Sequence, residues 1–299
     1  ESADNFDANW DKLIADYEAN GLEETEQMSI AIATIWDRMK QEEPMVHCMT
    51  HAITMNDSAN AILVVGASPI MASHPREVEE VVSHSDSLVV NLGNITDVRM
   101  EAMMKAGKRA WSLQIPTLID VVGIGTSTLR YDFAKAFIDA CHPGIIKGNS
   151  SEIRRLMGLP SHAKGVDSSR EDQVTVETIA QLAGPMRDFA TRMDAVIVMT
   201  GPIDMIVHSH GITGVKNGSP AMGHVTGTGC MLGAIIGAYH AVGPSFDAAL
   251  IGTIHMGLAG EEAWQTSRGY GTFHVHLSDA LGTMTKEKIL EEMDIRTIP

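Results

Sequence analysis

Short apolar runs alternate with helical patterns from residue 45 onward, and this alternation constrains the fold more than any other feature of the chain. The expected strands are residues 45–48, 68–71, 87–92, 117–121, 144–147 and 195–200. The helical patterns between them cover residues 55–64, 75–84, 97–110, 128–140, 150–158 and 173–191. This alternation predicts an α/β fold with three layers, in which helices cover both faces of a mostly parallel, buried central sheet.

In the remainder of the C-terminal half, the sequence pattern predicts a hairpin followed by helices. The hairpin pairs residues 203–208 with 212–216 around Ser209-His210-Gly211. Helical patterns then begin at Cys230 and cover 245–267 and 277–291.

The N-terminal segment differs in charge from the rest of the chain. Residues 1–43 carry 12 acidic and 3 basic side chains, a net charge of −9 out of −16 for all 299 residues. Two amphipathic helices, 6–19 and 25–41, are expected there, with Gly21 between them. We therefore divide the chain into an acidic helical segment, 1–43, and a single domain, 44–299.

The composition excludes several classes of partner. The acidic balance disfavours nucleic acid, whose phosphates need a basic surface. The apolar runs are far shorter than the roughly 18 residues that a membrane span needs. Cys48, Cys141 and Cys230 are odd in number and show no CxxC spacing, which argues against a disulfide framework and indicates a reducing, cytoplasmic setting.

The stretch Val225-Thr-Gly-Thr-Gly-Cys230 precedes a strongly apolar helical run. Gly227 and Gly229 permit a sharp turn and close approach of a ligand, and the free N–H groups and dipole of the helix start favour an anion such as a phosphate. The same dipole favours a thiolate at Cys230. The local pattern alone leaves open a plain glycine turn with a buried, inert cysteine.

Polar residues follow several of the expected strands. They include Asn91-Leu92-Gly93, Asp120, Lys147-Gly148-Asn149 and Thr200-Gly201. The carboxyl ends of parallel strands form the ligand-binding edge of such sheets, so we expect a site there. Lys147 either pairs with Glu152 or meets a nucleotide phosphate, and Thr200 either ends its strand in a turn or contacts phosphate through its hydroxyl.

Asn149 and Glu152 have the spacing of a helix capping box. The alternative is that Glu152 belongs to the surroundings of a Mg²⁺ ion, with Asp120 supplying a second carboxylate, since magnesium keeps several waters and uses few protein ligands. His274 and His276 have the spacing of ligands on one strand face, but no further ligand at a telling spacing supports a metal there. His47 and Cys48 are adjacent in a strand and point to opposite faces, so they do not form a nucleophile and base.

With these residues identified, most of the chain resembles the hydroxyethylthiazole kinase family of the ribokinase-like superfamily. The resemblance is carried by Val46-His47-Cys48, Gly66-Ala67-Ser68-Pro69, residues 88–93 and 120–125, Lys147 to Ile153, Lys164-Gly165-Val166-Asp167, Val225 to Cys230 and Gly269-x-Gly271-Thr272-Phe273. Cys230 is its most specific sign, because most ribokinase-like kinases have aspartate at that position.

The resemblance implies a ribokinase-like fold and transfer of the γ-phosphoryl group of ATP, with Mg²⁺, to the primary alcohol of 4-methyl-5-(2-hydroxyethyl)thiazole in thiamin salvage. It also implies a homotrimer with active sites at the subunit interfaces. Carried over by position, it implies catalysis by Cys230, Gly227 and Gly229, ATP contacts from Lys147 and Thr200, substrate contacts from Met71, Gly227 and His51, and a metal linked to Asp120 and Glu152.

The sequence departs from the family pattern at His51, where asparagine is usual, and at Asp57, where an aromatic residue is usual. Two alternatives therefore stay open. The first is a related kinase for another small heterocyclic alcohol, and the second is a non-catalytic trimer that binds thiazole or nucleotide. The second is disfavoured because binding alone would not need all of the retained residues Gly227, Gly229, Cys230, Asp120 and Glu152.

Overall fold

A nine-stranded sheet runs through the centre of the protein. The computed structural model describes residues 18–160 and 176–298, so most of the expected helix 6–19 and the motif Lys164–Asp167 lie outside the described residues. The strands lie in the order β2-β1-β3-β4-β5-β6-β7-β8-β9. Their bounds are β1 Met45–Met49, β2 Ser68–Ile70, β3 Ser87–Asn91, β4 Thr117–Asp120, β5 Ile145–Asn149, β6 Val196–Thr200, β7 Asp204–His208, β8 Gly211–Val215 and β9 Ile295–Ile298.

The pairing of the strands confirms the expected parallel core and hairpin. Strands β1 to β6 pair in parallel, whereas β7, β8 and β9 add antiparallel to one edge. The parallel register sets Asn91 opposite Asp120 and Asp120 opposite Lys147. Side chains in register on neighbouring strands share one face, so these three residues form a row across the carboxyl end of the sheet.

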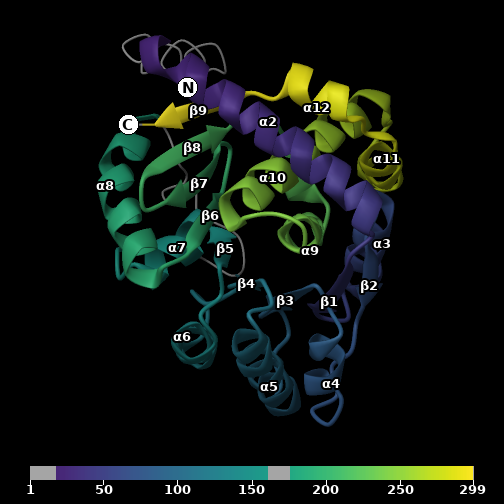
Figure 1. The fold of residues 1–299 in the computed structure, drawn as a ribbon, viewed down its shortest axis with the longest axis vertical. Coiled ribbons are helices and arrows are strands. Elements are labelled where there is room, and N and C mark those ends of the chain that lie inside the picture. The colour runs from purple at the N-terminus through teal and green to yellow at the C-terminus, as the bar shows by residue number, and fades with distance from the viewer. Residues whose placement is uncertain (1–17, 161–175, 299) are drawn as a thin grey trace.

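Helices cover both faces of the sheet, which gives the three-layer α/β/α arrangement (Figure 1). The helices on one side are α2 Glu18–Glu42, α3 Met55–Val65, α9 Thr228–His240, α10 Ser245–Thr266, α11 Tyr270–Thr283 and α12 Lys286–Glu292. Those on the other side include α4 Val78–Ser83, α5 Asp97–Leu113, α6 Thr128–Cys141, α7 Ser150–Leu156 and α8 Val176–Met193. A 3₁₀ helix, η2 Pro220–His224, precedes α9.

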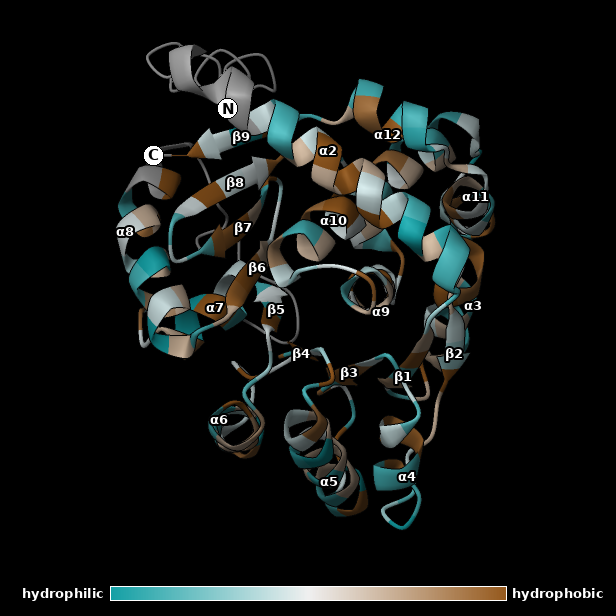
Figure 2. Cartoon of the chain, in the orientation of Figure 1, coloured by the Kyte–Doolittle hydropathy of each residue, from teal (hydrophilic) through white to brown (hydrophobic). Residues whose placement is uncertain are grey.

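Alternate residues of each strand build two separate cores. In β3, Val89 packs on the side of α9, whereas Leu88 and Val90 pack on the side of α5. The strands are accordingly apolar along most of their length (Figure 2). Helix α9 is buried on nearly every side, and within 18–160 and 176–298 no helix combines the length and the apolar character needed to cross a membrane.

The structure corrects the expected elements near both ends of the chain. Residues 18–42 form one continuous helix through Gly21, so the break expected there is wrong. The apolar face of α2, which includes Ile32 and Trp36, belongs to the core shared with α9 and α10. The helix expected over 277–291 is two helices, because Thr285 caps a new helix with its side chain, and β9 follows as a strand that the pattern did not indicate.

Candidate active site

Three polar side chains form a hydrogen-bonded row at the carboxyl ends of β3, β4 and β5. Asp120 Oδ2 accepts hydrogen bonds from Asn91 Nδ2 at 3.1 Å and from Lys147 Nζ at 3.0 Å. The Asp120 and Lys147 side chains are only 1% and 4% exposed. The alternative in which Lys147 pairs with Glu152 is therefore wrong, because the strand register places Asp120 nearer.

Burial and charge act in opposite directions on this pair. Burial raises the pKa of Asp120, against the opposing effects of the Lys147 ammonium and the Asn91 amide. Burial alone would lower the pKa of Lys147, but the charge and the hydrogen bond of Asp120 raise it overall. Lys147 is therefore a firmly protonated cation held under the start of α9.

The N-terminus of α9 lies directly above this row. Gly227 is the residue before the helix, with φ of 97°, a left-handed conformation that glycine adopts without strain. Two further glycines bring the helix close to the ion pair, since a Cβ on Gly233 would lie 3.2 Å from Asp120 Oδ2 and one on Gly229 would lie 4.0 Å from Lys147 Nζ. The free N–H groups of this turn and the Lys147 ammonium together form a site for an anion.

Cys230 lies in the first turn of α9, between Asn91 and His51. Its Sγ is 3.3 Å from Asn91 Nδ2 and 3.6 Å from His51 Nε2. Burial, followed by the charge of Asp120, raises the pKa of Cys230, and Lys147 opposes this only in part. Burial and the neighbouring carboxylate therefore favour the thiol at Cys230, in contrast to the thiolate expected from the helix start alone.

His51 follows β1 and is 7% exposed. Its imidazole lies against Gly93, where a Cβ would come within 2.1 Å of the ring Cδ2, and Thr54 Oγ1 lies 3.3 Å from Nε2. Burial and the charges of Arg99 and Arg130 lower the pKa of His51, so the ring is neutral near pH 7.

A pocket of about 580 Å³ opens on the other side of the α9 turn. It is lined by Asn149 and Thr200 at the ends of β5 and β6, by Thr228 and Gly229, and by the loop from Lys216 to Pro220. Cys230 and His51 do not line it. The glycine turn therefore separates this pocket from a small cluster formed by Cys230, His51 and Asn91. A site that transfers a group between two ligands needs two such neighbouring binding regions.

The family model described as the hydroxyethylthiazole kinase family matches residues 36–287. The chain belongs to this family. It is 39% identical over 259 residues to a protein named hydroxyethylthiazole kinase 2 from Clostridium botulinum (strain Hall), a match that covers 87% of this chain and 97% of that protein. The solved structure of a hydroxyethylthiazole kinase protein from Pyrococcus horikoshii OT3 superposes with a TM-score of 0.81 at 29% identity, over 90% of this chain and 99% of that one.

More distant structures confirm the ribokinase-like fold. A ribokinase-like superfamily protein from Enterococcus faecalis V583 superposes with a TM-score of 0.61 at 16% identity, over 84% of this chain and 89% of that one. The predicted fold class and family are both confirmed. Membership of a kinase family makes the chain a kinase, with ATP as the phosphate donor that such a family implies.

In this member of the hydroxyethylthiazole kinase family, Glu152 has the structural role that the capping-box spacing indicates. Its Oε2 accepts from the Asn149 N–H at 2.8 Å and its Oε1 from the Gly123 N–H at 2.6 Å, while the Asn149 side chain caps α7 in return. Burial raises the pKa of Glu152 to about 7, although both backbone hydrogen bonds oppose the shift. Each carboxylate oxygen thus accepts one backbone hydrogen bond.

Of the other residues with expected roles, Thr200 lies at the pocket, and Met71, His274 and His276 lie elsewhere in the fold. Thr200 lines the pocket, as an ATP contact requires, whereas Met71 is half-buried just after β2 and packs against the core on the α9 side of the sheet. His274 and His276 lie in helix α11, so they do not share a strand face, and His274 Nε2 is 3.3 Å from Asp57 Oδ2. The described residues contain no group of three or more side chains suited to a metal ion.

Three residues of the site were not selected from the sequence as site residues. Asn91 joins Asp120 to Cys230, and its place at a strand end was the available signal. Thr54 lies beside His51 in the turn after β1, and Asp204 lines the pocket with its Oδ1 accepting from the Gly201 N–H at 2.9 Å. Neither of these two belongs to a motif that would have indicated its role.

Proposed function

We propose that this protein transfers the γ-phosphoryl group of ATP to the primary hydroxyl of 4-methyl-5-(2-hydroxyethyl)thiazole, the reaction of thiamin salvage. One observation carries the proposal: the N-terminus of α9, above the buried Lys147, lies between a pocket of about 580 Å³ and the Cys230 cluster. Phosphoryl transfer needs alignment of donor and acceptor and stabilisation of charge, and little covalent chemistry from the protein. This arrangement supplies both.

Each residue of the proposed site takes a role that its position supports. ATP would occupy the pocket beside Thr200, with its phosphates directed to the N–H groups at Gly227 and Gly229 and to Lys147. The alcohol would bind on the other side of the turn, near Cys230 and His51. Met71 would contact the ring, which is a role carried over from the family alone.

Mg²⁺ is the proposed metal cofactor, and the chain supplies one open ligand for it. Asp120 Oδ1 is buried and has no hydrogen-bond partner among residues 18–160 and 176–298. Each oxygen of Glu152 already accepts one backbone hydrogen bond, so we assign Glu152 to the surroundings of the metal, where it also completes the α7 cap. When bound, Mg²⁺ would offset phosphate charge with several of its waters retained.

The homotrimer with interfacial active sites is part of the proposal. Helices α3 and α11 carry exposed apolar side chains, Leu63 and Val275, and contact each other through Asp57 and His274. Light scattering tests the assembly, and a monomer at working concentration would contradict a shared site. Three free cysteines, two of them buried, are compatible with the cytoplasmic setting that we also propose.

The deciding experiment measures ATP consumption with Mg²⁺, with and without 4-methyl-5-(2-hydroxyethyl)thiazole, and identifies the product by mass. We expect thiazole phosphate to form only when the alcohol is present, and Cys230→Ala to lower turnover far more than ATP affinity. A folded protein that binds ATP but makes no thiazole phosphate would contradict the proposal. A panel of small heterocyclic alcohols then tests the related-kinase alternative, which the presence of His51 beside Cys230 favours.

A further inference from the structure

The hydrogen bonds of Asn91 have only one possible direction. Its Oδ1 accepts from the Gly93 backbone N–H at 2.9 Å, and this fixes which end of the amide carries the hydrogens. Its Nδ2 therefore donates both hydrogens, one to Asp120 Oδ2 at 3.1 Å and the other to Cys230 Sγ at 3.3 Å. The sulfur accepts from Asn91, so the proton of the thiol must point elsewhere.

His51 offers the basic acceptor for that proton. Its Nε2 lies 3.6 Å from Cys230 Sγ. The absence of a side chain at Gly93 gives the imidazole its place, because a Cβ there would overlap the ring. If Nε2 accepts, the ring hydrogen is on Nδ1, which is buried and has no hydrogen-bond partner in the described part of the chain.

The surroundings of His51 keep its ring neutral and therefore able to accept. Arg99 donates from Nη2 to the Thr50 carbonyl at 2.8 Å, and Arg130 donates from Nη1 to the Leu92 carbonyl at 2.7 Å. These two arginines, from α5 and α6, bring positive charge to the ring, and the Cys230 thiol reaches it from α9. Thr54 contributes a neutral hydroxyl that lies 3.3 Å from Nε2 and also hydrogen-bonds the Cys230 thiol, but as an acceptor it is far less basic than the imidazole.

We propose that His51 accepts the Cys230 thiol proton, so that Cys230 and His51 form a proton relay for phosphoryl transfer. The relay rests on the proposed function. As the alcohol oxygen bonds to the γ-phosphorus and the bond to the ADP oxygen breaks, ADP leaves with that electron pair. The alcohol proton passes to Sγ while the thiol proton passes to His51 Nε2, and the imidazolium then releases a proton to solvent. Cys230 remains a thiol throughout, so its raised pKa is no obstacle.

Nuclear magnetic resonance tests the hydrogen bond without any substrate. Long-range ¹H–¹⁵N spectra of histidine-labelled protein report which ring nitrogen carries the hydrogen, and spectra of His51→Gln and His51→Asn identify the His51 signals by their absence. We expect His51 to be neutral with its hydrogen on Nδ1, and its Nε2 signal to shift in Cys230→Ala. A hydrogen on Nε2, or signals that do not respond to Cys230→Ala, would overturn the proposal even if the enzyme is active.

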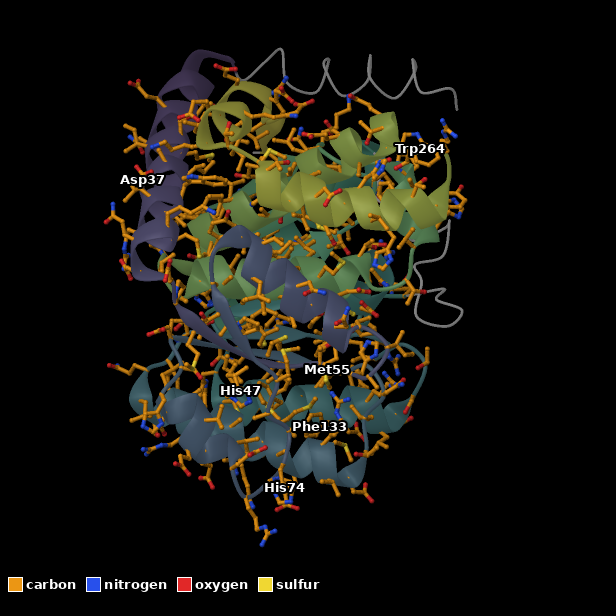
Figure 3. The ribbon with its side chains drawn as sticks, turned by 90° about the vertical axis from the view of Figure 1, so that its right-hand side faces the viewer. Asp37, His47, Met55, His74, Phe133 and Trp264 are labelled. Atoms are coloured by element: carbon orange, nitrogen blue, oxygen red, sulfur yellow. The ribbon has the colours of Figure 1, made fainter. Side chains whose placement is uncertain are left out.

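Kinetics then test the relay itself. His51→Gln keeps a polar group near Sγ but removes the base, so we expect kcat to fall by about tenfold while KM for ATP stays within about twofold. The loss is smaller than for a full general base because the developing phosphate bond also acidifies the alcohol. His74→Gln is the matched control, since His74 is exposed and lies at the far end of the molecule from the sheet (Figure 3). An unchanged kcat in both His51 variants would overturn the relay. A wild-type protein that makes no thiazole phosphate would instead refute the proposed function, and the hydrogen bond between Cys230 and His51 would then be tested by the spectra alone.

Discussion

Removal of the Lys147 ammonium is expected to destabilise the protein strongly. Lys147→Met leaves the Asp120 carboxylate buried with the Asn91 amide as its remaining donor. The two charges are 3.0 Å apart and at most 4% exposed, so the pair is one in which loss of a single partner costs roughly 3–5 kcal/mol. Because Asn91 stays, we expect about 3 kcal/mol, measured as the free energy of unfolding in urea near pH 8.

An exposed lysine provides the control. Lys105 Nζ lies 2.8 Å from Glu101 on the surface of α5, with side chains 40% and 56% exposed. Lys105→Met should change the free energy of unfolding by no more than about 0.5 kcal/mol, since water and salt screen such a pair. The double variant Asp120→Asn with Lys147→Met buries no charge and should recover much of the lost stability.

The pH dependence separates this electrostatic cost from a packing defect. Without Lys147, the folded-state pKa of Asp120 rises further above its unfolded value, so the folded state binds a proton that the unfolded state lacks. The stability of Lys147→Met should therefore be least perturbed at acidic pH and fall as pH rises through the folded-state pKa of Asp120. A loss equal to that of Lys105→Met, or one that does not depend on pH, would refute the reasoning.

Four other perturbations test the site. Gly93→Ala places a Cβ within 2.1 Å of the His51 ring and should lower turnover about as much as His51→Gln, measured by the same kinetic assay. Gly227→Ala puts alanine at φ of 97° and a Cβ 3.0 Å from Thr54 Cγ2, which should cost about 1–2 kcal/mol in urea unfolding and weaken ATP binding. Burial raises the pKa of Glu152 from 4.5 to about 7, so its contribution to stability is lost as pH rises toward 7, and Glu152→Gln should flatten that part of the stability profile by up to about 1.4 kcal/mol per pH unit. Chelation of Mg²⁺ should abolish thiazole phosphate formation, and unchanged turnover in excess chelator would contradict the metal.

The sheet was predictable because parallel strands that are buried on both faces have continuous apolar sequences that end abruptly. Strands β1 to β6 lie within about two residues of their expected bounds, and the row of Asn91, Asp120 and Lys147 follows from where those runs stop. The antiparallel edge strand β9 could not be predicted in the same way. Its four residues gain their pairing from β8, which lies far back along the chain.

The chemistry of the site was less predictable than its location. Sequence proximity offered Glu152 as one possible partner of Lys147, but neighbours in a sheet are set by register, which places Asp120 beside Lys147. The state of Cys230 depends on burial and on a carboxylate from another strand, which no local motif reports. The direction of the Asn91 hydrogen bonds depends on one backbone N–H at Gly93, a detail that only the folded chain defines.

The charge balance of the site explains why a metal belongs in the proposal. Lys147 is the only buried lysine or arginine in the described part of the chain. Its positive charge is already balanced by the Asp120 carboxylate in their ion pair. Glu152 and Asp204 lie close by, and burial raises the pKa of each to about 7. The negative charge of a bound phosphate would disfavour their ionised forms further. The N–H groups of the α9 turn carry only partial charges, which suffice to orient a phosphate but not to neutralise a triphosphate. In the function that we propose, a cation that arrives with the nucleotide would complete the balance, and Asp120 Oδ1, which is buried without a hydrogen-bond partner in the described part of the chain, would be its protein ligand.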